Sequence, residues 1–186
     1  MTQQIHEEMQ RLADERQELE RKYVEVEKQN SDLTNLFVAS QSLHLSLDRR
    51  QVLAAIQEII INLLGSEELA VFEVSQDGKA LELVDSFGLE PGKFARIPIG
   101  DGSIGKVAKE GQPMVDDPSR KKTEGLTACV PLMLGNQAVG AVAVFGLLPQ
   151  KQGLLPLDRD LLELLRAQAG LALYCTRLVQ KRGEEP

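Results

Sequence analysis

The chain has 186 residues, a formal net charge of −7 and an apolar fraction of 42%. The negative charge argues against a nucleic-acid surface, because contacts of Lys and Arg with phosphates supply most of the affinity of such surfaces. The polar N-terminus does not resemble a signal peptide, no apolar run reaches the length of a membrane span, and two distant cysteines suit a reducing compartment. We therefore expect a soluble cytoplasmic protein with no nucleic-acid partner and no membrane insertion.

The first 35 residues carry the pattern of a coiled coil. Apolar residues alternate at spacings of four and three, which is a heptad repeat. The d positions are Ile5, Leu12, Leu19, Val26 and Leu33, and the a positions are Met9, Arg16, Tyr23, Asn30 and Phe37. A single helix cannot bury this seam, and an Asn at an a position favours two parallel helices in one register. The sequence therefore predicts a parallel homodimer, with residues 1–35 as the coil and residues 36–181 as a separate domain.

The first part of the domain is expected to be helical and to lead into three strands. Asp48 is a suitable N-cap for a second helix that ends at Gly65. The buried stripe of this helix is expected at Leu53, Ile56, Ile60 and Leu63. Strands are predicted at Leu69–Val74, Leu81–Phe87 and Phe94–Ile99, with a hairpin turn at Gln76–Lys79 between the first two.

The second part of the domain continues with short elements and closes with a long helix. We expect a short helix at Ser103–Lys109, and strands at Met114–Val115, Leu126–Met133 and Ala138–Phe145, the last two joined at Gly135-Asn136. The closing helix is expected from Asp158 to about Lys181. One of its stripes (Leu162, Leu165, Ala169, Ala172, Val179) suits packing on the sheet, and the other (Leu164, Leu171, Cys175, Leu178) suits a second surface. Residues 182–186 have the composition of a disordered tail.

The dimer interface is expected to combine the coil with the second stripe of the closing helix. The residues concerned are Leu12, Leu19, Tyr23, Val26, Asn30, Leu33, Phe37, Leu164, Leu171 and Leu178. The order of elements predicts an α+β fold, an antiparallel sheet of about five or six strands with helices mainly on one side, preceded by the long coiled-coil helix.

The order of these elements, together with five segments, resembles the GAF domain family over roughly residues 31–180. The segments are Leu69–Val74, Ile99–Ala108, Gln112–Asp117, Cys129–Leu132 and Val139–Phe145. The resemblance implies a regulatory sensor module of the kind found in phosphodiesterases, phytochromes, histidine kinases and bacterial activators. It also implies dimerisation through the first and last helices.

Three features depart from the ligand-binding and catalytic members of the family. The segment Asp116–Gly125 is short and polar, whereas members that bind cyclic nucleotides or bilins enclose the ligand beneath a longer segment. The signature linked to cyclic-nucleotide binding is absent. The free-methionine-sulfoxide reductases of this fold rely on several cysteines, and this chain has two, Cys129 and Cys175.

Other residues that suggest chemistry have simpler interpretations. Gly100, Gly102 and Gly105 match a dinucleotide fingerprint in spacing, but they lack its βαβ context and fit a tight turn into a short helix. His6 and His44 have no second metal ligand nearby in the sequence. Asp116-Asp117 and the basic Arg120–Lys122 segment suit a solvated loop. No arrangement of residues typical of a catalytic site stands out.

The leading hypothesis is a non-catalytic, dimeric GAF-type signalling module without a cofactor, which binds another protein of a signalling pathway. The first alternative is a sensor that binds a small molecule between the sheet and the helix at Ser103–Lys109, with Phe72, Phe87 and Val115 as wall residues. The second is an oxidoreductase that uses Cys129.

Overall fold

The computed structural model describes residues 2–90, 92, 94–115, 125–151 and 153–183. The chain divides into two compact units, Met1–Phe37 and Val38–Pro186, and each is described by itself. Helix α1 (Thr2–His44) supplies the described residues of the first unit and the beginning of the second.

The polar surface of the first unit is organised by ion pairs between residues four apart. Arg11 pairs with Glu15 at 3.1 Å, Arg16 with Glu20 at 3.2 Å, and Lys22 with Glu18 at 2.7 Å. Exposed pairs of this spacing add only a few tenths of a kcal/mol each to a helix. The helix therefore gains little from its charges. Most of the apolar side chains that the structure describes in this unit, from Met9 to Phe37, are exposed.

The second unit is built on a six-stranded antiparallel sheet with the strand order β3-β2-β1-β6-β5-β4. This confirms the predicted α+β architecture. The strands are β1 (Leu69–Val74), β2 (Ala80–Phe87), β3 (Arg96–Pro98), β4 (Met114–Val115), β5 (Ala128–Leu134) and β6 (Gln137–Val144). β3 is shorter than the predicted Phe94–Ile99, and it ends at Pro98, which lacks the N–H that would extend the ladder.

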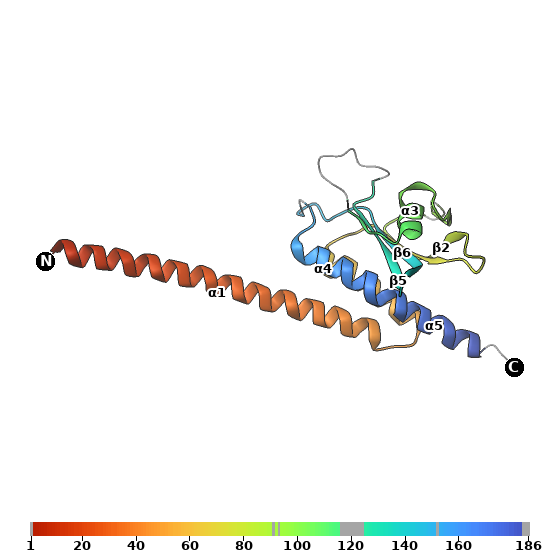
Figure 1. Ribbon diagram of the computed structural model, residues 1–186, viewed down its shortest axis with the longest axis horizontal. Coiled ribbons are helices and arrows are strands. Elements are labelled where there is room, and N and C mark those ends of the chain that lie inside the picture. The colour runs from red at the N-terminus through yellow and green to blue at the C-terminus, as the bar shows by residue number, and fades with distance from the viewer. Residues whose placement is uncertain (1, 91, 93, 116–124, 152, 184–186) are drawn as a thin grey trace. The chain divides into compact units, whose positions relative to one another are not determined.

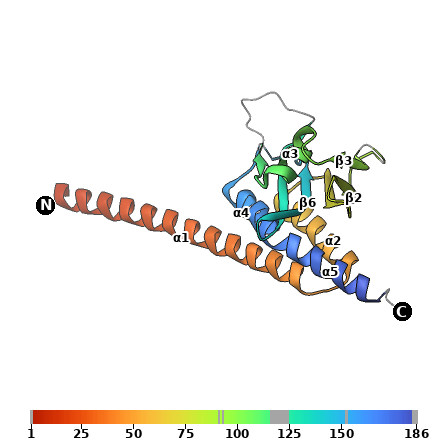
Figure 2. The same ribbon diagram turned by 45° about the vertical axis from the view of Figure 1, so that its right-hand side comes forward.

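Helices cover both faces of the sheet, with most of them on one side (Figures 1 and 2). That side carries α2 (Arg49–Glu58), the π-helix η1 (Ile59–Leu64), α4 (Pro156–Leu164), the π-helix η2 (Leu165–Ala169) and α5 (Gly170–Gly183). Among the described residues, the helix on the other face is α3 (Gly102–Glu110), which begins one residue before the predicted Ser103 and has Asp101 as its N-cap. Asp101 takes this position because its backbone is extended and its carboxylate accepts a hydrogen bond from the N–H of Gly102 at 3.1 Å.

The two π-helical segments were not predicted, and the first changes which residue is buried. Leu64 is fully buried, whereas Leu63, expected in the buried stripe, is only half-buried. A π-helix makes i→i+5 hydrogen bonds and holds more residues per turn, so the residue that returns to the buried side comes one position later. Gly65 ends the segment in the left-handed conformation with φ 75°, as its position predicted.

A nearly buried ion pair holds the loop before α4 against η1. Nζ of Lys151 lies 2.7 Å from Oδ1 of Asp158 and also donates to the carbonyl oxygen of Leu64. Oδ2 of Asp158 accepts a hydrogen bond from the N–H of Leu155 at 2.6 Å. The Asp158 side chain is 2% exposed, so its charge depends on Lys151 for compensation.

Replacing Lys151 with Met is expected to lower the free energy of unfolding by about 3 kcal/mol, because it leaves the Asp158 carboxylate buried without a cation. Urea unfolding followed by circular dichroism measures the change. Lys106→Met, at an exposed position on α3, is the matched control and should change stability by less than about 0.5 kcal/mol. Equal free energies of unfolding for the two variants would show that the ion pair of Lys151 with Asp158 does not stabilise the domain.

Candidate functional site

The face of the sheet beneath α3 is packed with apolar side chains. Ile104, Val107 and Ala108 of α3 lie against Ala70, Phe72, Leu81, Leu126, Cys129, Ala141, Ala143 and Phe145. Phe94 stacks on Phe145 with ring centroids 5.1 Å apart. Leu83, Ile97 and Met114 are partly buried at the margin of the same cluster. This is the face on which the sensor hypothesis places a small molecule.

The structure does not bring the three proposed wall residues together. Phe72 belongs to the cluster under α3 and is fully buried. Phe87 pairs with Leu69, and Val115 pairs with Ala128, each of which precedes a cluster residue on its own strand. Successive residues of a strand point to opposite faces, and directly paired residues share a face. Phe87 and Val115 therefore lie on the face opposite Phe72.

A β-bulge in β2 is the reason that Phe87 is on the other face. The register passes from Val71↔Asp85 to Phe72↔Leu83, so Val84 is the extra residue. Leu83 points to α3, and without the bulge Phe87, four residues later, would do the same. Phe145 and Ile104 also lie on this face and were not predicted there. The alternation of Ala141, Ala143 and Phe145 was a signal that could have identified one side of it.

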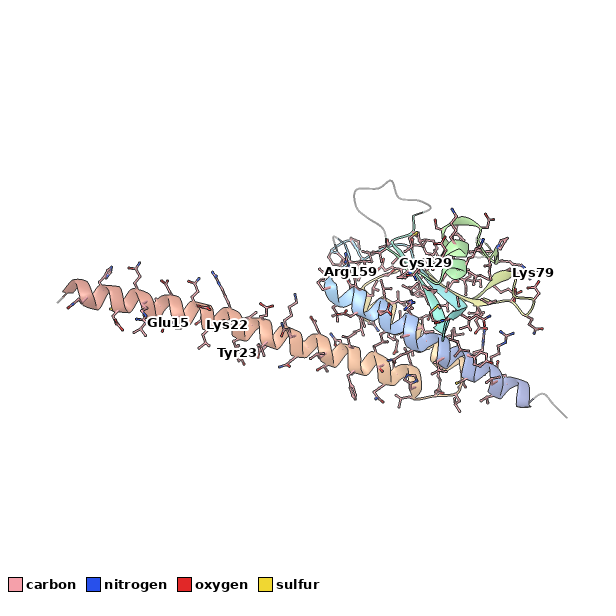
Figure 3. The ribbon with its side chains drawn as sticks, viewed as in Figure 1. Glu15, Lys22, Tyr23, Lys79, Cys129 and Arg159 are labelled. Atoms are coloured by element: carbon pink, nitrogen blue, oxygen red, sulfur yellow. The ribbon has the colours of Figure 1, made fainter. Side chains whose placement is uncertain are left out.

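Cys129 lies inside the domain on β5 (Figure 3) and is fully buried. Burial raises the pKa of its thiol to about 12. A nucleophilic cysteine needs its thiolate at neutral pH, so this environment makes Cys129 unreactive. Cys175 on α5 is partly exposed and is also a free thiol.

The three glycines before and within α3 serve the turn and the packing. Gly100 and Gly102 have φ of 94° and 58°, values that favour glycine. A Cβ on Gly105 would lie 2.4 Å from the carbonyl oxygen of Pro98, so only glycine allows this close approach. The antiparallel sheet provides no βαβ unit for a dinucleotide at this position.

Two classes of site find no support in the part of the chain that the structure describes. No group of three or more His, Cys, Asp or Glu side chains there could hold a metal ion. No helix among those residues has the length and apolar character needed to cross a membrane. Asp116-Asp117 and the Arg120–Lys122 segment, together with most of the short polar segment Asp116–Gly125, lie outside the described residues.

The predicted seam of α1 is exposed along the first unit. Leu19, Val26 and Leu33 are 68%, 53% and 64% exposed, and Tyr23 projects freely from α1 (Figure 3). Leu12 and Phe37 are similarly exposed, as is the polar Asn30. Apolar side chains exposed at this heptad spacing need a partner helix to leave water.

The closing helix of the second unit presents its own uncovered stripe. Leu162, Leu165, Ala169 and Ala172 are buried, as expected for packing on the sheet. Leu171 and Leu178 are 44% and 47% exposed, and Leu164 and Cys175 are intermediate. Val179, expected in the buried stripe, is exposed because the covered part of α5 ends at Thr176.

Comparisons with known proteins agree with this fold. The GAF domain from an Acinetobacter phosphoenolpyruvate-protein phosphotransferase is similar with a TM-score of 0.65 and 16% identity, over 81% of this chain and 96% of that one. Residues 122 to 287 of a methyl-accepting chemotaxis protein give a TM-score of 0.59 and 20% identity, over 76% and 98% of the two chains. Free methionine-R-sulfoxide reductase from Neisseria meningitidis, solved in complex with its substrate, gives a TM-score of 0.60 and 18% identity, over 77% of this chain and 89% of that one.

Sequence comparisons give a family rather than individual relatives. No curated protein matches the sequence. Residues 46–173, which cover most of the second unit, match the family of the GAF domain. The chain therefore belongs to the GAF domain family.

Proposed function

We propose that this chain is a non-catalytic regulatory module that works as a parallel homodimer and binds another protein of a signalling pathway. The observation that supports this proposal is the exposed heptad seam of α1, with Leu19, Val26 and Leu33 each more than half exposed. Full burial of one Leu or Val side chain is worth about 1.5–3 kcal/mol. A second copy offers the same seam in the same register, which makes it the simplest partner.

Polar residues of the seam give the dimer its register rather than its strength. Asn30 at an a position is satisfied by the Asn30 of a second copy when the two helices are parallel and in register. In that arrangement Lys22 of one helix would face Glu27 of the other, but Glu15 would face Glu20. Lys22 already binds Glu18 of its own helix, and this hydrogen bond lowers the pKa of the Glu18 carboxyl. The apolar seam therefore supplies most of the association energy.

The exposed stripe of α5 extends the proposed interface into the GAF domain. Leu171 and Leu178 lie seven residues apart in α5, on one line of that helix, and both are exposed. Leu164 of α4 is seven residues before Leu171, but the π-helical turn of η2 lies between them and shifts it from that line. Some of these side chains close the homodimer in this proposal, and those left exposed beside it anchor the partner protein. Buried apolar anchors usually dominate binding energy, so the helical face is a better docking surface than a charged loop such as Arg120–Lys122.

Small-molecule sensing on the face beneath α3 is the alternative function. It is supported by the partial burial of Leu83, Phe94 and Met114 at the margin of the core cluster, where an apolar ligand would find contacts. The short Asp116–Gly125 segment and the tight packing of Phe72 with α3 weigh against a large ligand such as a cyclic nucleotide. Micromolar binding of a cyclic nucleotide in calorimetry would favour this alternative.

An oxidoreductase that uses Cys129 is the weakest reading, because the raised pKa of the buried thiol keeps it protonated at neutral pH. Nothing in the comparisons assigns a reaction to this chain, since likeness at this level of identity concerns the fold alone.

The dimer proposal predicts different effects for two valines that lie two positions apart on α1. Val26 is at a d position and Val24 is at a b position, and both are more than half exposed in the single chain. Val26→Ser is expected to raise the dissociation constant of the dimer roughly a hundredfold, because two buried side chains are lost per dimer. Val24→Ser should leave it nearly unchanged, although it makes the same chemical change in the same helix.

Sedimentation equilibrium at micromolar concentration measures both variants and the unmodified chain. The combined change of Leu19, Val26 and Leu33 to Ser should give a monomer. A monomeric mass for the unmodified chain would contradict the homodimer outright.

The two thiols are expected to differ in reactivity. In the folded protein an aromatic disulfide reagent should react with Cys175 only, and Cys129 should react after unfolding in denaturant, because burial keeps its thiol neutral and inaccessible. The number of thiols that react per chain, read from absorbance, checks this. Rapid reaction of folded protein carrying Cys175→Ser would instead reveal an accessible thiolate at Cys129 and favour the redox alternative.

A further inference from the structure

The last residues of α1 belong to the GAF domain and are held there by apolar packing. Ala39 and Leu43 are 2% and 0% exposed, whereas Phe37 and Val38 just before them are open to solvent. Apolar burial is non-directional, so it holds the helix against the domain but does not by itself fix how far along the surface the helix sits.

A single side chain of the closing helix supplies the directional contacts. Oε1 of Gln168 accepts a hydrogen bond from Oγ of Ser40 at 2.8 Å and lies 3.1 Å from Nε2 of His44. His44 donates to this oxygen in the tautomer that carries its hydrogen on Nε2. Ser40 and His44 are one helical turn apart on one face, which allows both to reach the same oxygen. We call these three residues the Gln168 clasp.

The Gln168 clasp can form completely in one position of α1 only. A slide of one turn in one direction would bring Leu36 and Ser40 to Gln168, and Leu36 has no donor. A slide in the other direction would bring His44 and Asp48, but α1 ends at His44 and the Asp48 carboxylate caps α2 through the N–H of Arg50. Each slide therefore loses one of the two hydrogen bonds. One polar contact among apolar ones is an established way to select a single helix register.

Gln168 itself stands on a firmly held part of the domain. It lies in η2, where Leu165 and Ala169 are fully buried. The next residue, Gly170, is so close to β5 that a Cβ would lie 2.6 Å from the carbonyl oxygen of Met133. Movement of β5 relative to the helices would therefore act on Gly170, which is two residues from Gln168 in the chain. Single π-helical turns of this kind occur frequently at functional positions.

We propose that the Gln168 clasp is a register lock between the GAF domain and the coil. While the clasp is closed, α1 is held at one position along the closing helix. Opening the clasp frees α1 to slide by one turn along that helix. Sliding of one packed helix past another by one turn is a known kind of switching movement. The regulatory meaning of the lock rests on the proposed function, because it is the coil that would carry the change to a partner.

The test measures the position of α1 on the domain in the full chain. Spin labels are attached at Gln41→Cys on α1 and Arg159→Cys on α4, both exposed, in a chain that also carries Cys175→Ala. Cys129 is buried and stays unlabelled. The labelled chain is mixed with an excess of unlabelled chain, so that only distances within one chain are recorded by pulsed electron resonance.

With the clasp intact, a single narrow distance is expected. Gln168→Leu should add a second distance shifted by up to about 5 Å, the rise of one helical turn. Ser40→Ala combined with His44→Ala should give the same second distance, and this route leaves the closing helix unaltered if Gln168→Leu fails to fold. Gln168→Glu keeps an acceptor oxygen and should restore the single distance. Gln180→Leu, an exposed glutamine of the same helix, is the matched control.

A single unchanged distance in folded Gln168→Leu, or in the Ser40 and His44 double variant, would overturn the register lock. Sedimentation of the same samples separates this result from a failure of the homodimer. If the clasp variants are monomeric and show two distances, the register lock is supported and the homodimer is contradicted. If they are dimeric and show one distance, the homodimer is supported and the register lock is contradicted.

Discussion

The domain depends on covering two central strands that are apolar on both faces. Ala70, Val71 and Phe72 of β1 and Ala141, Val142 and Ala143 of β6 are all fully buried. A strand of this kind is stable only if helices pack on each side of the sheet. On one side the described residues provide the short helix α3, which packs in one cluster with the small Ala141 and Ala143 of β6, and the opposite side takes two longer helical segments.

Close packing on the larger side determines what the closing helix can offer to others. Gly170 brings η2 and α5 against the backbone of Met133, and the stripe from Leu162 to Ala172 is buried against the sheet. A helix has more faces than one sheet can cover, so Leu171 and Leu178 remain outside. The surface proposed for assembly is therefore a by-product of the same packing that makes the fold stable.

The sequence predicted the order and type of the elements well, because alternation, caps and turns are local signals. Gly135-Asn136 marked its hairpin, Asp48 its helix start and Gly65 its helix end. The errors occur where a strand or a helical turn holds one residue more than its regular repeat. The bulge at Val84 put Phe87 on the wrong face for the expected pocket, and the π-helical turn buried Leu64 in place of Leu63. Neither irregularity has a residue signature that a single sequence reveals.

The candidate site was harder to predict than the fold for the same reason. The exposed seam of α1 follows from periodicity alone, and the side chains stand where that periodicity puts them. The contact between Gln168 and the pair Ser40 and His44 joins residues more than a hundred positions apart. No local pattern marks Gln168 as different from other polar residues of its helix, since its role depends on how two distant helices meet.

The two ends of the sheet have a consequence for how copies of this protein stay apart. The outer strands are very short: β3 has three residues and ends in a proline, and β4 has two. Short strands and proline at a sheet edge leave few backbone groups that another chain could extend into a continuous sheet, and this protects against edge-to-edge aggregation. Copies at high local concentration therefore have little opportunity to join strand to strand, which leaves orderly association to the helices.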